Sequence, residues 1–138
     1  MTTVIHLSSF SLFRKGVRQY VGSRDGVRII GEAENGAQLL ALLEHQLPDV
    51  LLMDILLPGM PVSEIFSEVT SRYPDIKILI LSVHNAPSVI VSMLEMGAKG
   101  YLTIDSEAEE IHQLILASSR PGILFSKDAK RSLIPGEK

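Results

Sequence analysis

Short apolar runs alternate with segments of helical periodicity along most of the chain. Runs rich in Val, Ile and Leu occupy residues 4–7, 27–30, 50–53 and 76–81, and a shorter one lies at 101–102. These runs do not alternate cleanly with polar residues, which is typical of strands buried on both faces of a parallel sheet. The pattern therefore predicts five parallel strands.

Between these runs, apolar residues recur three to four positions apart, as on one face of a helix. The five stripes are Phe13, Val17, Tyr20 and Val21; Leu39, Leu40 and Leu43; Ile65, Phe66 and Val69; Ile90, Met93 and Leu94; and Ile111, Leu114 and Ile115. Short connections rich in Gly, Pro, Asn and Ser separate the elements. Five strand–helix units predict a doubly wound α/β domain, and no internal period supports the alternative of a helical repeat. A further short helix is expected near residues 126–133.

Composition narrows the class of protein. The 138 residues, 46% of them hydrophobic, suffice for one domain with a single core. With 13 basic against 16 acidic residues, the net charge of −3 argues against a nucleic-acid-binding face on this segment. The chain has no cysteine, secretory signal or run long enough to span a membrane, so we expect a cytoplasmic protein.

Candidate chemistry lies where the predicted strands end, because parallel strands place their carboxyl ends along one edge. Ser8 and Ser9, Asp54, Ser82 and Ile104 occupy these positions. One of the two serines is expected to cap the following helix, and the basic stretch "FRKGVR" to form its solvated face. The sequence offers no Ser-His-Asp arrangement, phosphate-binding glycine loop or paired metal-ligand histidines, so we expect no enzyme activity.

Two blocks, "PDVLLMDILLPGM" and "GAKGYL", resemble the receiver domain of bacterial two-component response regulators. Together with "SLFRKGV" and "GEAENG", they are most similar to receivers that precede a LuxR-type helix-turn-helix domain. The resemblance implies a flavodoxin-like fold with strand order 2-1-3-4-5. It also implies a receiver over residues 1–120, and an extension over 121–138 that starts a linker to a DNA-binding domain outside this chain.

The resemblance further implies a role for each strand-end residue. Asp54 corresponds to the aspartate that accepts a phosphoryl group from a histidine kinase. Ser82 corresponds to the hydroxyl that contacts the phosphate, and Tyr101 to the aromatic that turns inward behind it. The family's acidic pair and its lysine are replaced by Ser8, Ser9 and Ile104. Two neutral serines are poor ligands for Mg²⁺, which needs carboxylates, so we expect weak or no Mg²⁺ binding and no other cofactor.

These substitutions favour an atypical receiver that regulates and dimerises without Mg²⁺-dependent phosphorylation. The alternatives are a conventional receiver phosphorylated on Asp54, and a module that binds a protein or an uncharged ligand beside Ile104. Expected partners are a histidine kinase or another upstream protein and a second copy of the chain, with DNA contacted only through a later domain. Exposed apolar residues within 89–96 or 111–116 are the predicted dimer faces.

Overall fold

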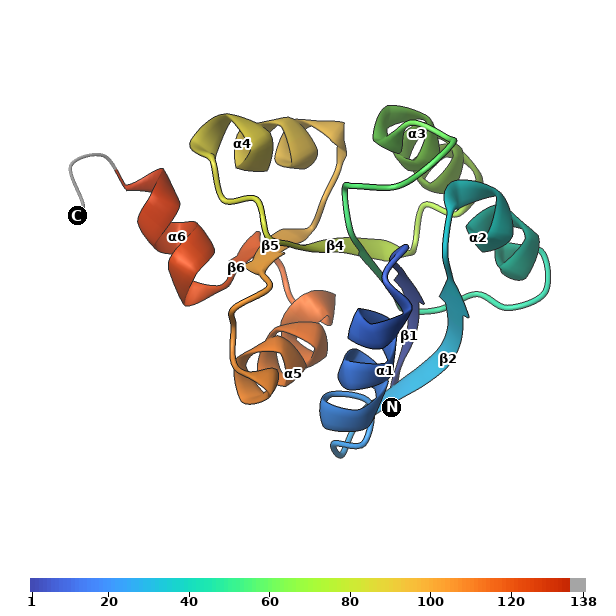
Figure 1. Ribbon diagram of the computed structural model, residues 1–138, viewed down its shortest axis with the longest axis horizontal. Coiled ribbons are helices and arrows are strands. Elements are labelled where there is room, and N and C mark those ends of the chain that lie inside the picture. The colour runs from blue at the N-terminus through green and yellow to red at the C-terminus, as the bar shows by residue number, and fades with distance from the viewer. Residues whose placement is uncertain (135–138) are drawn as a thin grey trace.

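Six parallel strands form one sheet at the centre of the protein, a computed structural model of which describes residues 1–134 (Figure 1). Their spatial order is β2-β1-β3-β4-β5-β6, which contains the expected order 2-1-3-4-5. The strands are β1 (Thr2–Leu7), β2 (Val27–Ala33), β3 (Val50–Met53), β4 (Lys77–Ser82), β5 (Gly100–Thr103) and β6 (Leu124–Phe125). The parallel α/β fold is thus confirmed.

The prediction of five strands and five helices was wrong, because residues 1–134 contain six strands and six α-helices. The added strand, β6, pairs in parallel with β5 at Gly100 and Tyr101. It is two residues long, too short to produce a periodic pattern in the sequence. The added helix, α6 (Lys127–Leu133), occupies the segment where a short tail helix was expected, and the Ser126 hydroxyl caps it by accepting from the Ala129 amide.

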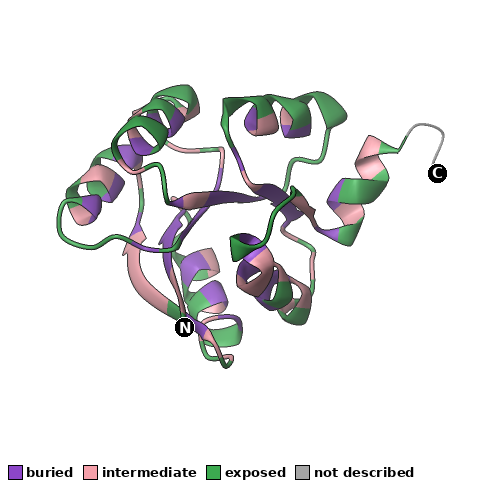
Figure 2. Ribbon diagram, turned by 180° about the vertical axis from the view of Figure 1, so that it is seen from behind, coloured by how far each residue is buried: buried purple, intermediate pink, exposed green. Residues whose placement is uncertain are grey.

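The helices cover the two faces of the sheet unequally. Helices α1 (Ser11–Tyr20) and α5 (Ala108–Leu116) lie on one face, while α2 (Gly36–Leu43), α3 (Val62–Arg72) and α4 (Pro87–Met96) lie on the other (Figure 1). Each layer has its own apolar cluster, and the central strands between them are fully buried (Figure 2). Burial on both faces explains why these strands read as unbroken apolar runs.

Short connections bring the carboxyl ends of the strands to a common edge. The Asp54 amide donates to the Leu7 carbonyl at 2.9 Å, and the Ile104 amide donates to the Ser82 carbonyl at 2.9 Å. Backbone bonds therefore join the end of β1 to the residue after β3, and the end of β4 to the residue after β5. This edge, here called the crevice, is where a ligand of a doubly wound sheet is expected.

The carboxyl-terminal extension contains a strand and a helix before residue 134. Strand β6 extends the sheet, and α6 lies at its end beside α4 (Figure 1). The linker start is predicted in "IPGEK", residues 134–138, of which 135–138 lie outside the described residues. No helix within residues 1–134 has the length and apolar character needed to cross a membrane.

Candidate functional site

The crevice gathers three of the predicted site residues in a buried position. Ser8 and Ser82 are fully buried, and Asp54 retains 5% of its exposure. Asp54 directly follows β3, whose four residues are all fully buried. Because β3 is buried, it holds the backbone of Asp54 in place and so fixes the position of the carboxylate.

Backbone amides of its own loop hold the Asp54 carboxylate. Its Oδ1 accepts from the Ile55 amide at 2.6 Å and more weakly from the Leu56 amide at 3.4 Å. These contacts orient one oxygen toward the β3–α3 loop. Among residues 1–134, the Asp54 carboxylate forms no ion pair with a lysine or arginine side chain. The position where the family has its lysine is occupied by Ile104.

The two serines after β1 are used locally. Ser8 Oγ accepts from the Phe10 amide at 3.2 Å, and Ser9 Oγ lies 3.5 Å from the Leu56 carbonyl. The expectation that one of them caps α1 was wrong, because the helix begins at Ser11 and its N-cap, Phe10, provides no side-chain bond. The Ser8 hydroxyl instead closes the turn that precedes the helix.

Arg14 is the main residue of this region that sequence reasoning missed. It was expected on a solvated face, yet only 9% of it is exposed. Its Nη1 donates to the Ser8 carbonyl, its Nε donates to Glu32 Oε1 at 3.2 Å, and Nη2 reaches Glu34 Oε1 at 3.5 Å. The guanidinium thus ties α1 to the end of β2 and to the corner after β1. Its position three residues before Val17, on the buried side of α1, was the available indication.

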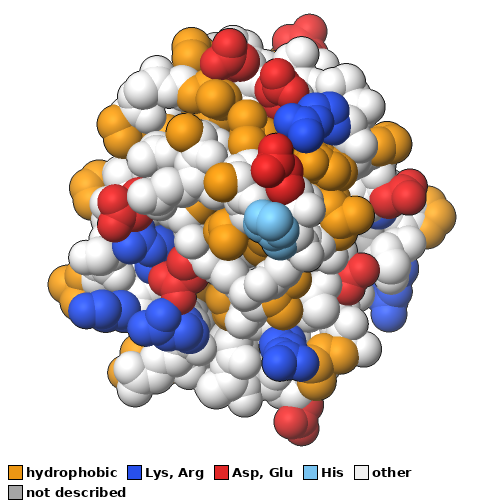
Figure 3. Space-filling view, turned by 90° about the vertical axis from the view of Figure 1, so that its right-hand side faces the viewer, with side chains coloured by type: hydrophobic (Ala, Val, Ile, Leu, Met, Phe, Trp, Pro, Cys, Tyr) orange, Lys and Arg blue, Asp and Glu red, His pale blue; other side chains and the backbone are white. Residues whose placement is uncertain are grey.

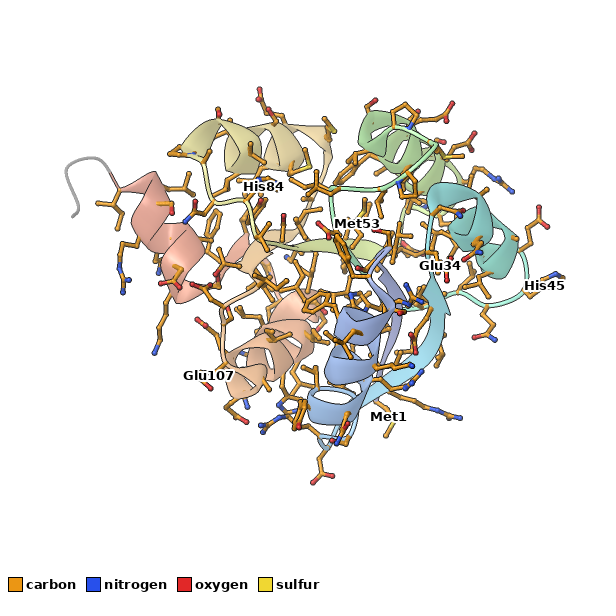
Figure 4. The ribbon with its side chains drawn as sticks, viewed as in Figure 1. Met1, Glu34, His45, Met53, His84 and Glu107 are labelled. Atoms are coloured by element: carbon orange, nitrogen blue, oxygen red, sulfur yellow. The ribbon has the colours of Figure 1, made fainter. Side chains whose placement is uncertain are left out.

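Ser82 and Tyr101 lie together at the far side of the crevice. The Tyr101 side chain is fully buried, and its hydroxyl donates to the backbone carbonyl of His84, which lies on the β4–α4 loop (Figure 4). Ser82 Oγ accepts from the His84 amide at 3.2 Å. Burial raises the pKa of Tyr101, its hydrogen bond with Ser82 opposes that shift, and the nearby Asp54 charge adds to it. The structure therefore brings Asp54, Ser82 and Tyr101 into one site.

Ile104 turns away from this polar cluster toward an apolar groove of about 570 Å³ between α1 and α5. The groove is lined mainly by apolar side chains of α1 and α5, among them Phe13, Val17 and Ile111. Three groove residues are largely exposed, with Phe10 at 56%, Leu12 at 81% and Tyr20 at 63%. Ile104, at the position of the family's lysine, therefore contributes to an apolar surface and supplies no cation to the Asp54 carboxylate.

The predicted site residues offer few oxygen ligands for Mg²⁺. Within residues 1–134 no three His, Asp or Glu side chains gather in a metal-binding arrangement. The Leu56 carbonyl, which could serve as a ligand, lies near the Ser9 hydroxyl, and among the predicted site residues Asp54 alone carries a carboxylate. Since Mg²⁺ is held through carboxylates, phosphate and water, we derive no step through a metal.

The surface shows no nucleic-acid-binding character on the side formed by α2 and α3. There, cationic and anionic side chains are interspersed with apolar ones, without a continuous basic face (Figure 3). A nucleic-acid interface requires clustered cations opposite the phosphates. The observed mixture agrees with the net charge of −3.

Comparisons with known proteins place these features in context. Residues 10–116 match the family described as "Response regulator receiver domain". The probable transcriptional regulatory protein NarL of Mycobacterium tuberculosis (strain CDC 1551 / Oshkosh) is 36% identical over 105 residues, which are 76% of this chain and 49% of the relative. The chain thus spans about half the length of that curated relative.

Two solved structures are similar. The signal receiver domain of the putative response regulator NarL from Mycobacterium tuberculosis has a TM-score of 0.80 at 32% identity, covering 87% of this chain and 98% of that one. A structure of two RcsB dimers bound to two parallel DNAs has a TM-score of 0.86, covering 96% of this chain and 67% of that one. At 18% identity, the second likeness supports the fold alone.

Proposed function

Because this chain belongs to the response regulator receiver family, we propose that it is an atypical receiver that regulates without Mg²⁺-dependent phosphorylation of Asp54. The observation that carries the proposal is the crevice itself. It holds one carboxylate, neutral hydroxyls at Ser8 and Ser9, and an isoleucine in place of the lysine. The fold and the Asp54–Ser82–Tyr101 group are retained, while the charges that would serve phosphoryl transfer are missing.

The energetic cost of losing these charges supports the proposal. Phosphoryl transfer depends mainly on positioning and on neutralising the charge of the transferred group. Two unit charges about 4 Å apart interact by roughly 4 kcal/mol at an effective dielectric of about 20. Each 1.36 kcal/mol changes a rate about tenfold, so losing the lysine and the metal together slows acyl phosphate formation by several orders of magnitude.

Phosphorylation with a small-molecule donor tests this proposal. The protein is incubated with acetyl phosphate and Mg²⁺ and followed by intact mass, alongside Asp54→Asn and a triple variant, Ser8→Asp/Ser9→Asp/Ile104→Lys. We expect no mass gain in the native protein or in Asp54→Asn, and a gain of one phosphoryl group in the triple variant. A gain in the native protein that Asp54→Asn abolishes would establish a conventional receiver instead.

We further propose that a second copy of the chain covers the α1–α5 face. The prediction of exposed apolar residues within 111–116 was wrong, because Ile111 and Ile115 are buried against the sheet. Residues 89–96 offer only Val91 and Met96 as largely exposed apolar side chains. The exposed apolar surface comes instead from the groove residues Phe10, Leu12 and Tyr20.

Charge complementarity supports this choice of partner. The exposed Lys15 on α1 and the exposed Glu107, directly before α5, carry opposite charges. An isologous contact would place the basic edge of one copy opposite the acidic edge of its partner. The RcsB structure, which is described as containing dimers, provides a precedent for pairing in this fold.

The wider biological role follows from the family. We propose that the receiver acts in the cytoplasm and receives its input from a histidine kinase or another upstream protein. Its output would pass through a DNA-binding domain beyond Lys138, since the chain spans 49% of its NarL relative. DNA contact by the receiver itself is not part of this proposal.

A further inference from the structure

We propose that residues 123–133, which contain β6 and α6 and are here called the carboxyl-terminal clamp, hold the Tyr101 ring inward beneath the crevice. Release of the clamp would then free the ring and loosen the β4–α4 loop. This coupling is independent of whether Asp54 is ever phosphorylated, so it goes beyond the proposed function.

The backbone of the clamp is bonded directly to Tyr101 and its neighbours. The Ser126 amide donates to the Tyr101 carbonyl at 3.2 Å, and the Leu124 amide donates to the Lys99 carbonyl at 3.0 Å. The two strands approach closely at Gly100, where a Cβ atom would lie 2.6 Å from the Leu124 carbonyl oxygen. Glycine at this position allows β6 to pair tightly beside the tyrosine.

A buried hydroxyl joins the strand to the helix of the clamp. Ser126 is fully buried, and its Oγ accepts from the Thr103 amide at 3.0 Å and lies 3.1 Å from Thr103 Oγ1. The same oxygen caps α6 by accepting from the Ala129 amide at 3.3 Å. One atom therefore ties the end of β5 to the start of α6, so displacement of either loosens the other.

Side chains of the clamp also close the space beside the ring. Tyr101 belongs to the apolar cluster that includes the fully buried Ala129, and Phe125 and Leu133 pack against that cluster. Without β6, β5 would be the edge of the sheet, and the ring could turn outward past that edge. With the clamp in place, Phe125 lies beside Tyr101 in the paired strand, and the Tyr101 hydroxyl donates to the His84 carbonyl.

The ring and the clamp thus form a two-sided contact between the crevice and the carboxyl-terminal segment. On one side the hydroxyl holds the loop after β4 through His84. On the other side the backbone and the ring are held by β6 and α6. An upstream partner that pulls on the chain after residue 134 would therefore alter the crevice, and a ligand at the crevice would alter the clamp.

Fluorine NMR of Tyr101 tests the coupling. The chain contains two other tyrosines, Tyr20 and Tyr73, and a Tyr20→Phe/Tyr73→Phe background leaves Tyr101 as the single site for 3-fluorotyrosine. Exposure of the Tyr101 ring is measured as the broadening of its fluorine resonance by a soluble gadolinium chelate. Release of α6 is measured by exchange of its backbone amides, so that both ends of the coupling are observed in the same protein.

Two variants release the clamp to different extents. Ala129→Asp places a charge at a fully buried position of α6 and should displace the helix, while Ser126→Ala removes the buried hydroxyl. The matched controls are Lys130→Asp, at an exposed position next to Ala129, and Ser132→Ala, whose hydroxyl donates only within α6 to the Asp128 carbonyl.

We expect the background protein and both controls to show one resonance that the chelate barely broadens. Ser126→Ala should increase the broadening, and Ala129→Asp should increase it several-fold. The pKa of Tyr101, which burial raises, should fall toward its ordinary value in Ala129→Asp. A ring that stays protected in Ala129→Asp although the α6 amides exchange freely would overturn the proposal, as would an exposed ring in the background protein.

Discussion

His6 makes the stability of this fold depend on pH in a way that one substitution should remove. The side chain lies on β1, is 1% exposed, and packs edge-on against Phe13 with 5.5 Å between ring centroids. Within residues 1–134, neither ring nitrogen has a hydrogen-bond partner. Burial, together with the nearby Arg14 charge, lowers the pKa of His6 from 6.5 to about 3. The imidazole is therefore neutral in the folded protein over most of the acid range.

The size of the effect follows from proton linkage. Below pH 6.5 the unfolded chain binds a proton at His6 that the folded chain does not bind until about pH 3, so stability falls as the pH falls through this window. Between pH 7 and pH 5 this single group lowers the free energy of unfolding by about 2 kcal/mol. His6→Leu abolishes this contribution. At pH 7 the variant should also be more stable by roughly 1 kcal/mol, since unpaired buried polar groups cost about 1–3 kcal/mol and the lost aromatic contact offsets part of the gain.

Urea unfolding of both proteins at pH 7, 6 and 5 measures the prediction. The stability difference between His6→Leu and the native protein should grow from roughly 1 kcal/mol at pH 7 to roughly 3 kcal/mol at pH 5. His45→Leu, at an exposed position, is the control and should show no such growth. A difference that stays constant with pH, or an NMR titration of His6 near its ordinary pKa, would refute the reasoning.

Two further substitutions test the contacts around the crevice and the proposed dimer. Arg14→Met removes the guanidinium bonded to the Ser8 carbonyl, Glu32 and Glu34, and should lower the free energy of unfolding by roughly 1–3 kcal/mol; the exposed Lys15→Met should change it little, and equal effects in a urea titration would contradict the bridging role. Leu12→Glu places a charge on the exposed apolar face and should shift a dimer to a monomer in light scattering, whereas Leu47→Glu, also exposed but away from α1, should not. A Leu12→Glu protein that dimerises like the native chain would exclude this face.

Much of the fold could be predicted because burial on both faces of a parallel sheet leaves a clear trace in the sequence. Strand β3 consists of four apolar residues that are fully buried, and the predicted run has the same bounds. Strand β6 left no such trace: two residues cannot show a period, and their pairing depends on the close approach at Gly100. Its existence is decided by tertiary contacts.

The site was predictable in its positions and less so in its interactions. Asp54 follows β3 and Ser82 ends β4, while Tyr101 lies within the neighbouring strand β5. The role of Arg14 was missed because a basic residue on a helix is usually solvated, although it lies three residues before the buried Val17. Neither Ser8 nor Ser9 caps α1 as expected, because the Ser8 hydroxyl accepts from the Phe10 amide in the turn before the helix.

Binding of Mg²⁺ with beryllium fluoride, a mimic of the phosphoryl group, tests the central claim most directly. The claim is that a lone carboxylate with neutral serines and an isoleucine around it cannot assemble that complex. Isothermal titration calorimetry of the native protein should show no saturable binding up to millimolar Mg²⁺, whereas Ser8→Asp/Ser9→Asp/Ile104→Lys should bind. Saturable micromolar binding by the native protein that Asp54→Asn abolishes would contradict the account.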